Sequence, residues 1–153
     1  MENKQGILEV VKMKKVIYVF IFVLLISVGT TNFARAAQTP AQVFESYYKA
    51  VKAGNFESMI SYLASKLQEK AKQVPQEQKS KFVQFQEKLL PSTYTIGKTD
   101  INGNYATVHL KGKVVHPRTG EERSFGRVYL LKESGAWKIF KFNWKKNESD
   151  FKK

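Results

Sequence analysis

Hydrophobic and polar residues recur at helical spacing in the first half of the chain and alternate along the second half. The clearest alternation is INGNYATVHLKGKVV, residues 101–115. Ala106 and Val108 share one face of an extended chain here, while Thr107 and His109 share the other. Such alternation is typical of an antiparallel strand with one buried and one exposed face.

Four helices are predicted between residues 39 and 91. The sequence TPAQ at 39–42 has the residues of a capping box, with proline in the first turn. Gly54 is suited to end that helix and Asn55 to cap the next, and SKLQ at 65–68 repeats the capping-box pattern. The last helix is expected to bury Phe82, Phe85, Leu89 and Leu90 together on one side. The predicted ranges are 40–53, 56–64, 66–74 and 76–90.

Four strands are predicted after Pro91, at 93–101, within 101–115, at 123–133 and at 136–144. Asn102-Gly103 tolerates the positive φ angles of a type I′ turn, and Ser134-Gly135 marks another turn. Helices followed by an antiparallel meander indicate an α+β fold, with a curved sheet that carries the helices on one face.

The last predicted strand is apolar on both faces. Trp137 and Ile139 fall on one face, and Phe140, Phe142 and Trp144 on the other. A strand of this kind is either covered on both sides or lies at an interface. Cover by the N-terminal segment or by the tail is the first explanation, and a homodimer through the outer sheet face is the second.

The N-terminal segment has the order of a secretory signal peptide. Lys14 and Lys15 precede the uncharged run 16–29, and small residues lead to a cleavage site between Ala36 and Ala37. An uncleaved membrane anchor is the alternative. Either way, we expect the folded part to be exported to a periplasmic or extracellular location.

Three segments are therefore expected. Residues 1–36 form the signal peptide, with Met13 as the expected translation start, because two acids in the first twelve residues do not suit a basic n-region. Residues 37–146 form one domain, and 147–153 form a charged tail that we expect to fray.

Composition narrows the chemistry. The chain has no cysteine, which excludes thiol catalysis, thiolate metal sites and a lipid-modified N-terminal cysteine. His109 and His116 are seven residues apart and fall on opposite faces of a strand, so no metal site and no cofactor is predicted. The formal net charge is +13 at pH 7, and +10 without residues 1–36; a charge of that size favours contact with anionic surfaces.

The motifs also resemble a known family. TPAQVFESYYKAVKAGNFESMISYLASK, INGNYATVHLKGKV and GRVYLLKESGAWKIFKF, in this order, are similar to small exported bacterial proteins of the nuclear-transport-factor-2-like, cystatin-like roll superfamily. The most similar group is a domain family of unknown function found in secreted proteins and lipoproteins, whose lipobox cysteine this chain lacks. The resemblance implies a cone in which a bent sheet wraps a long helix, often with a pocket, and it implies no single activity.

Two candidate sites follow. The aromatic residues suggest a ligand pocket in the cone, formed by Phe44, Tyr48, Tyr62 and Trp137. Basic residues on neighbouring strands suggest a patch for anionic surfaces, formed by Lys98, Lys111, Lys113, Arg127 and Lys141. No acidic residue has an obvious place in an apolar pocket, so no catalytic residue is predicted.

We therefore expect an exported, non-catalytic domain that binds a small ligand or an envelope protein. An isomerase- or dehydratase-like enzyme that uses the cone is one alternative, and it would need a carboxylate base there. A basic adaptor to anionic envelope polymer or lipid is the other. The export signal argues against nucleic acid as the partner.

Overall fold

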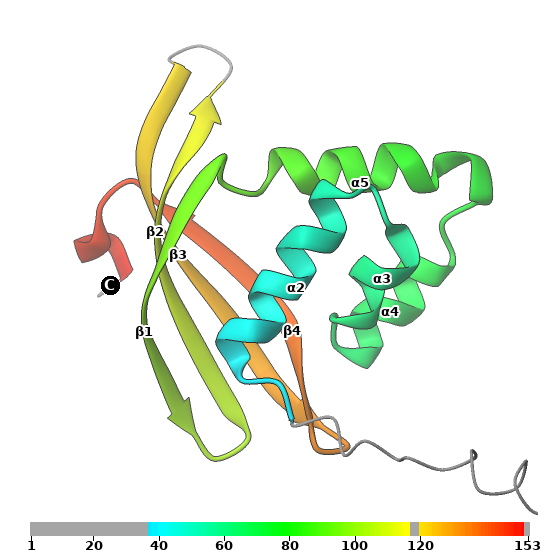
Figure 1. The fold of residues 1–153 in the computed structure, drawn as a ribbon, viewed down its shortest axis with the longest axis horizontal. Helices are drawn as coiled ribbons and strands as arrows, with labels where there is room; N and C mark the ends of the chain where they lie inside the picture. The colour runs from blue at the N-terminus through cyan, green and yellow to red at the C-terminus, as the bar shows by residue number, and fades with distance from the viewer. Residues whose placement is uncertain (1–36, 117–119, 152–153) are drawn as a thin grey trace, which may run out of the picture. The chain divides into compact units, whose positions relative to one another are not determined.

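The computed structural model describes residues 37–116 and 120–151, with the helices first and the strands after them (Figure 1). The predicted signal peptide and Ala36 lie outside the described residues. The helices are α2 (Pro40–Lys52), α3 (Phe56–Ser61), α4 (Ser65–Lys72), η1 (Gln76–Gln78) and α5 (Lys79–Lys88). The strands are β1 (Thr93–Asn102), β2 (Tyr105–His116), β3 (Gly120–Glu133) and β4 (Ala136–Lys145), and the 3-10 helix η2 (Glu148–Phe151) follows them.

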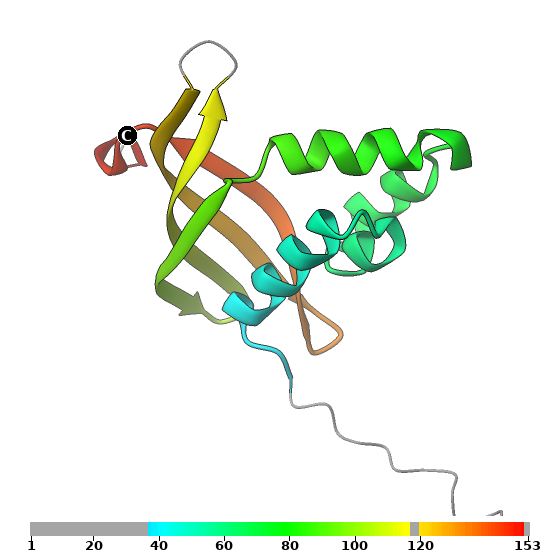
Figure 2. The same cartoon turned by 45° about the horizontal axis from the view of Figure 1, so that its top comes forward.

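The four strands form one antiparallel sheet in the order β1-β2-β3-β4, and α2 crosses one face of it (Figures 1 and 2). We call this the inner face and the opposite one the outer face. Val108 and Leu130 of the inner face are fully buried, as is Phe44 of α2. This packing confirms the predicted α+β class. No helix of the described part is long and apolar enough to cross a bilayer.

The starts of the first two helices are as predicted, and the first ends within one residue of the predicted position, whereas α3 ends at Ser61 and not at residue 64. The Thr39 side chain accepts a hydrogen bond from the backbone N–H of Gln42, whose own side chain accepts one from the Thr39 N–H. Gly54 follows α2 with φ +69°, which only glycine adopts without strain. The Asn55 side chain accepts a hydrogen bond from Ser58 N–H and so caps α3. These local signals act within three or four residues.

The predicted capping box at residues 65–68 is wrong. Ala64 is the N-cap of α4, and the Gln68 amide donates back to the Leu63 carbonyl at 2.8 Å. The carboxylate of Glu133 accepts hydrogen bonds from Ser65 N–H at 3.0 Å and from Ser65 Oγ at 2.7 Å. A residue 68 positions along the chain therefore caps this helix in place of a local side chain.

The β1–β2 turn differs from the predicted one, whereas the β3–β4 turn is at the predicted residues. Asn102 pairs with Tyr105, so the β1–β2 loop is Gly103–Asn104 and not the predicted Asn102–Gly103. Gly103 has φ +56°, which is the pattern of a type II′ turn with glycine first. The Ser134–Gly135 turn is confirmed, with positive φ at both positions.

A β-bulge in β4 explains its aromatic residues. Leu130 pairs with Ile139 but Tyr129 pairs with Lys141, so Phe140 is an extra residue. Trp137, Ile139, Phe142 and Trp144 all pack against the core on the inner side, whereas the Phe140 ring contacts Tyr105 and Tyr129 on the outer face. The predicted strand with two apolar faces is therefore wrong, because the bulge moves both halves of β4 onto one face.

Two further contacts complete the fold. The backbone segment 62–64 runs beside β4, where Ala64 N–H donates to the Ile139 carbonyl and Ile139 N–H donates to the Tyr62 carbonyl, each at 2.8 Å. Beyond β4, the guanidinium of Arg127 lies 4.2 Å from the centre of the Phe151 ring. The expectation of a frayed tail is thus wrong for residues 148–151, which form η2.

Candidate functional site

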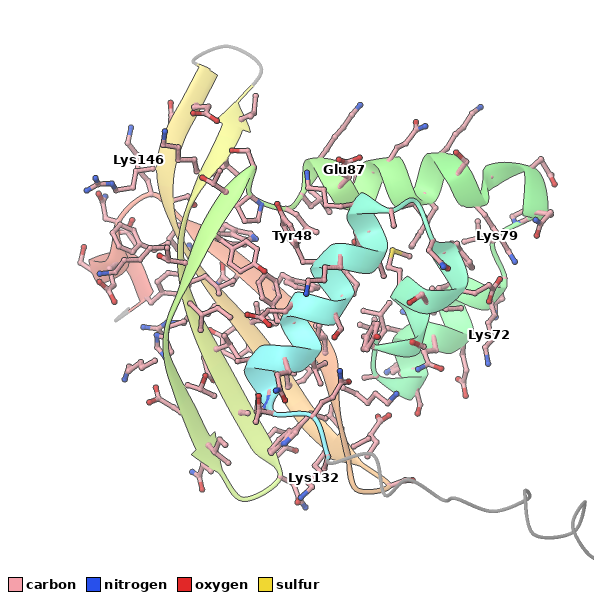
Figure 3. All side chains as sticks on the ribbon, in the orientation of Figure 1. Tyr48, Lys72, Lys79, Glu87, Lys132 and Lys146 are labelled. Carbon is pink, nitrogen blue, oxygen red and sulfur yellow. The ribbon has the colours of Figure 1, made fainter. Side chains whose placement is uncertain are left out.

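The interior of the cone is filled with aromatic rings. The Phe44 ring meets the Tyr94 ring edge-on, with centroids 5.0 Å apart, and the Tyr48 ring lies 4.7 Å from the Tyr94 ring. The Tyr48 hydroxyl donates to the Pro91 carbonyl at 3.0 Å, which ties α2 to the start of β1 (Figure 3). Phe44 and Tyr48, both predicted to line a pocket, are packing residues here.

The other two predicted pocket residues lie elsewhere. Tyr62 is the C-cap of α3 and pairs through its carbonyl with β4. Trp137 lines an open hollow of about 360 Å³ beside the first turn of α2, together with Thr99, Ile101 and Lys132. None of the other three predicted residues is in its wall. The hollow beside Trp137 thus contains one of the four predicted pocket residues, and a pocket formed by all four stays a prediction.

The titratable groups inside the cone are phenols. Burial raises the pKa of Tyr47, whose hydroxyl donates to Gln86 Oε1 at 3.3 Å. Burial, and then the charge of Glu45, raise the pKa of Tyr94. None of the carboxylates in the described residues is fully buried. The enzyme alternative stays a prediction that these contacts do not test.

Three of the five predicted patch residues are held by neighbours. Lys98 Nζ lies 2.9 Å from Asp100 Oδ2, Arg127 stacks on the Phe151 ring, and the Lys141 ammonium lies 5.6 Å from the centre of the Tyr129 ring. All three lie on the outer face of the sheet, but each contacts its own neighbour, so the three do not form one patch.

The remaining two, Lys111 and Lys113, meet a residue that the sequence prediction missed. Lys113 pairs across strands with Arg123, and Lys111 with Phe125, in the register of β2 and β3. All four side chains line a hollow of about 520 Å³, together with Thr93 and Thr95. Three cations and one aromatic ring from two strands therefore line the same hollow.

A second hollow of about 500 Å³ adjoins the first. Arg123 and Phe125 belong to both, and Lys146, Asn147 and Glu122 complete the second. Lys146 points away from the helices, on the outer side of the sheet (Figure 3). We call Lys111, Lys113, Arg123, Phe125 and Lys146 the basic groove, which runs across the sheet from β1 to the end of β4.

One acid, Glu121, limits the positive charge of the groove at Lys113. Glu121 accepts hydrogen bonds from Lys113 Nζ at 3.2 Å and from Ser92 Oγ at 3.1 Å, and these bonds, the lysine's first, lower its pKa. Lys111 and Arg123 have no ion pair among residues 37–116 and 120–151. Their charge is therefore available to an anionic ligand.

Metal-binding chemistry is limited in the described part of the chain. His109 Nε2 lies 2.8 Å from Asp100 Oδ2, which is a two-residue contact. No cluster of three or more His, Asp or Glu side chains that could hold a metal occurs there. The groove therefore offers cations and an aromatic ring as its chemistry.

Comparisons with known proteins place the fold. No protein-family model and no curated protein matches the chain. A solved structure of a SEC-C motif protein from Rhodopseudomonas palustris is 14% identical, with a TM-score of 0.51 over 72% of this chain and 83% of that one. An NTF2-like protein of unknown function from Shewanella oneidensis is 11% identical, with a TM-score of 0.43 over 68% and 93%. Another from Pseudomonas putida is 11% identical, with a TM-score of 0.42 over 68% and 81%.

At identities this low, likeness extends to the fold and not to ligand or activity. The open four-stranded sheet with four helices before it confirms the predicted fold class. NTF2-like proteins are among the structural neighbours. The described residues thus form an α+β domain, and the likeness to the Rhodopseudomonas palustris structure extends to its fold alone.

Proposed function

We propose that this protein is an exported, non-catalytic domain that binds an anionic envelope polymer in the basic groove. The observation that carries the proposal is the convergence of Lys111, Lys113 and Arg123 around Phe125. Arginine and lysine are the side chains that bind phosphate groups, arginine through two parallel hydrogen bonds. From Ala37 onward the chain has 21 Lys/Arg and 11 Asp/Glu, and this net charge of +10 adds a long-range attraction to the same class of partner.

The shape of the groove favours a chain over a single small anion. Its cations come from β2, from β3 and from Lys146 after β4, and neighbouring strands are about 4.8 Å apart. A linear polyanion crossing the strands meets these cations in succession. Its binding then weakens with salt, because the Debye length falls from about 30 Å at 0.01 M to about 8 Å at 0.15 M.

The test uses soluble poly(glycerol phosphate) as a lipid-free probe. Lys111→Glu with Lys113→Glu should weaken binding at low salt by about tenfold or more, since each cation near an anionic surface contributes about fivefold. The matched control is Lys70→Glu with Lys72→Glu, which makes the same charge change on α4. Equal losses in the two variants would show that net charge alone attracts the polymer, and the groove would then have no special role.

A homodimer through the outer sheet face is the competing occupant of this surface. Like charges in the groove would face each other in such a dimer, which opposes it at low salt. Sedimentation velocity of the parent and of the Lys111→Glu, Lys113→Glu variant tests this alternative. A dimer that strengthens when Lys111 and Lys113 become Glu would replace the polymer proposal.

The hollow beside Trp137 carries a second candidate, the binding of a small apolar ligand. Ile101, 59% exposed, and Trp137 form apolar parts of its wall. In a Trp144→Phe background, the fluorescence of Trp137 reports on this hollow alone. A change in that fluorescence on adding 8-anilinonaphthalene-1-sulfonate, lost in Ile101→Ser, would support the candidate. An unchanged signal would remove it.

Export itself is tested by intact mass. A processed protein from the native host should begin at Ala37. A protein that still carries residues 16–29 would instead be anchored by that segment.

A further inference from the structure

Helix α5 has two sides of different character. Its inner side is fixed to the fold: Val83 is buried, the Phe82 ring meets the Phe56 ring at 5.8 Å, and Gln86 accepts the hydrogen bond from Tyr47. Positions 80, 81, 84, 85, 88 and 89 share the other side and are all exposed. We call these six the α5 outer side.

The α5 outer side displays large apolar groups. Phe85 is 57% exposed and Leu89 is 49% exposed, although the helical pattern predicted both as core residues. That prediction is wrong because Phe82, Val83 and Leu90 already fill the side that faces the domain. Two large apolar side chains one turn apart on an exposed helix are available for contact with a partner.

The same side is positively charged. Lys81 and Lys88 stand four residues before Phe85 and three residues after it, so both flank its ring. No acidic residue occurs among the six positions. Glu87 points to Lys52, with 3.1 Å between the carboxylate and the ammonium, while Lys81 and Lys88 have no ion pair within the described residues.

We propose that the α5 outer side binds the surface of an anionic lipid bilayer. Phe85 and Leu89 enter the boundary between headgroups and acyl chains, and Lys81 and Lys88 contact the lipid phosphates. Charge complementarity selects an anionic partner, and the exposed apolar groups select a bilayer because a hydrophilic polymer has no apolar phase for them. This site is on another element than the basic groove and does not depend on it.

The position of α5 in the described part of the chain suits this contact. In both views α5 runs along the border of the helices, with the upper end of the β2–β3 hairpin on the same side (Figures 1 and 2). A hollow of about 480 Å³ lies next to the C-terminal end of α5, lined by Lys88, Leu90 and the 62% exposed Val115 among others.

The experiment measures co-sedimentation of the chain without residues 1–36 with vesicles of phosphatidylcholine, with and without phosphatidylglycerol. Phe85→Ser with Leu89→Ser should lower the partition coefficient for anionic vesicles about tenfold or more. The matched control is Ile101→Ser with Tyr105→Ser, which removes equally exposed apolar groups at the opposite end of the sheet. The control should bind as the parent does, and all variants should keep the parent's unfolding midpoint.

The charges are tested separately. Lys81→Glu with Lys88→Glu should lower vesicle binding at least about tenfold, because each lysine near an anionic surface contributes about fivefold to the affinity. The same change should reduce the salt dependence of binding. A Phe85→Trp variant, in a background with Trp137 and Trp144 changed to Phe, should shift its emission to the blue on anionic vesicles. This spectral readout reports insertion even if the affinity is modest.

Several results would overturn the proposal. They are absence of vesicle binding by the parent, equal binding to neutral vesicles, and an unshifted emission of the Phe85→Trp variant on vesicles to which it binds. Vesicle binding that is lost with Lys111→Glu and Lys113→Glu but kept with Phe85→Ser and Leu89→Ser would assign the membrane to the basic groove. The polymer assay contains no lipid and tests only the basic groove. A negative result there would therefore not count against membrane binding by the α5 outer side.

Discussion

The two faces of the sheet are made from the same strands, but the inner face is buried against helices and the outer face carries the basic groove. On β2, Val108 and Leu110 of the inner face are buried against α2, while Lys111 and Lys113 of the outer face line the basic groove. Neighbouring residues of one strand therefore alternate between the core and the groove that we propose as a binding site. Adjacent positions on the strand face opposite sides of the sheet, so a substitution at one position affects folding stability and a substitution at the next affects the outer surface.

The largest expected effect sharpens this contrast by removing an aromatic ring from each face. Phe44→Ala empties a site with no solvent exposure and should lower the free energy of unfolding by about 3–5 kcal/mol. Phe140→Ala removes a half-buried ring from the outer face and should cost clearly less. Urea unfolding measures both, and equal losses would mean that the outer face is part of the core.

The next effect adds one methyl group to each of two strand glycines. A Cβ at Gly126 would lie 2.3 Å from the Trp144 ring, so Gly126→Ala should cost about 1–3 kcal/mol through overpacking. A Cβ at Gly97, in the β1 bulge, would lie 3.4 Å from the His109 carbonyl. Gly97→Ala should therefore fold with nearly the parent's stability. Similar unfolding midpoints for the two variants would contradict the close approach of Trp144.

Alkaline pH should affect the inner face through Tyr47. Burial raises its pKa above the ordinary 10.0, so its contribution to stability is complete below pH 10 and is lost as pH rises through and beyond that value. Unfolding free energies measured across this range should fall less steeply in Tyr47→Phe than in the parent. Parallel curves would show that Tyr47 does not carry the alkaline sensitivity.

Acidic pH should affect the outer face through Asp100, with the smallest effect. The hydrogen bond from Lys98, and then that from His109, lower the pKa of Asp100 below 3.8. Its contribution is present above pH 3.8 and is lost as pH falls through the lowered value. Lys98→Met should raise the pKa of Asp100. An NMR titration that records the chemical shift of the Asp100 carboxyl carbon against pH measures this change. Because the group is fully exposed, we expect no visible change in folding.

Signals confined to a few residues predicted the fold well. The Thr39 cap, Gly54 and the alternation from Ala106 to Leu110 each depend on neighbours within one turn or one strand. The cap of α4 by Glu133 and the bulge at Phe140 depend on which distant segments meet. No local pattern specifies such meetings.

The candidate sites divide in the same way. Lys111 and Lys113 were predicted together because residues two apart on a strand share a face. Arg123 was missed because the predicted third strand, 123–133, had no register with the second strand, whereas in the structure β3 begins at Gly120 and pairs Arg123 with Lys113. The exposure of Phe85 follows from the competition of several apolar residues for one side of α5, and the packing of α2 and α3 decides it.

The backbone pairing between segment 62–64 and Ile139 also bears on how the chain behaves at high concentration. An uncovered edge strand offers free N–H and carbonyl groups to a strand of another molecule, which is the usual start of aggregation. Here Tyr62 and Ala64 occupy those groups at the middle of β4, and the bulge at Phe140 interrupts the ladder just beyond them. A segment of three residues thus blocks the growth of this sheet at its β4 edge from one molecule into the next.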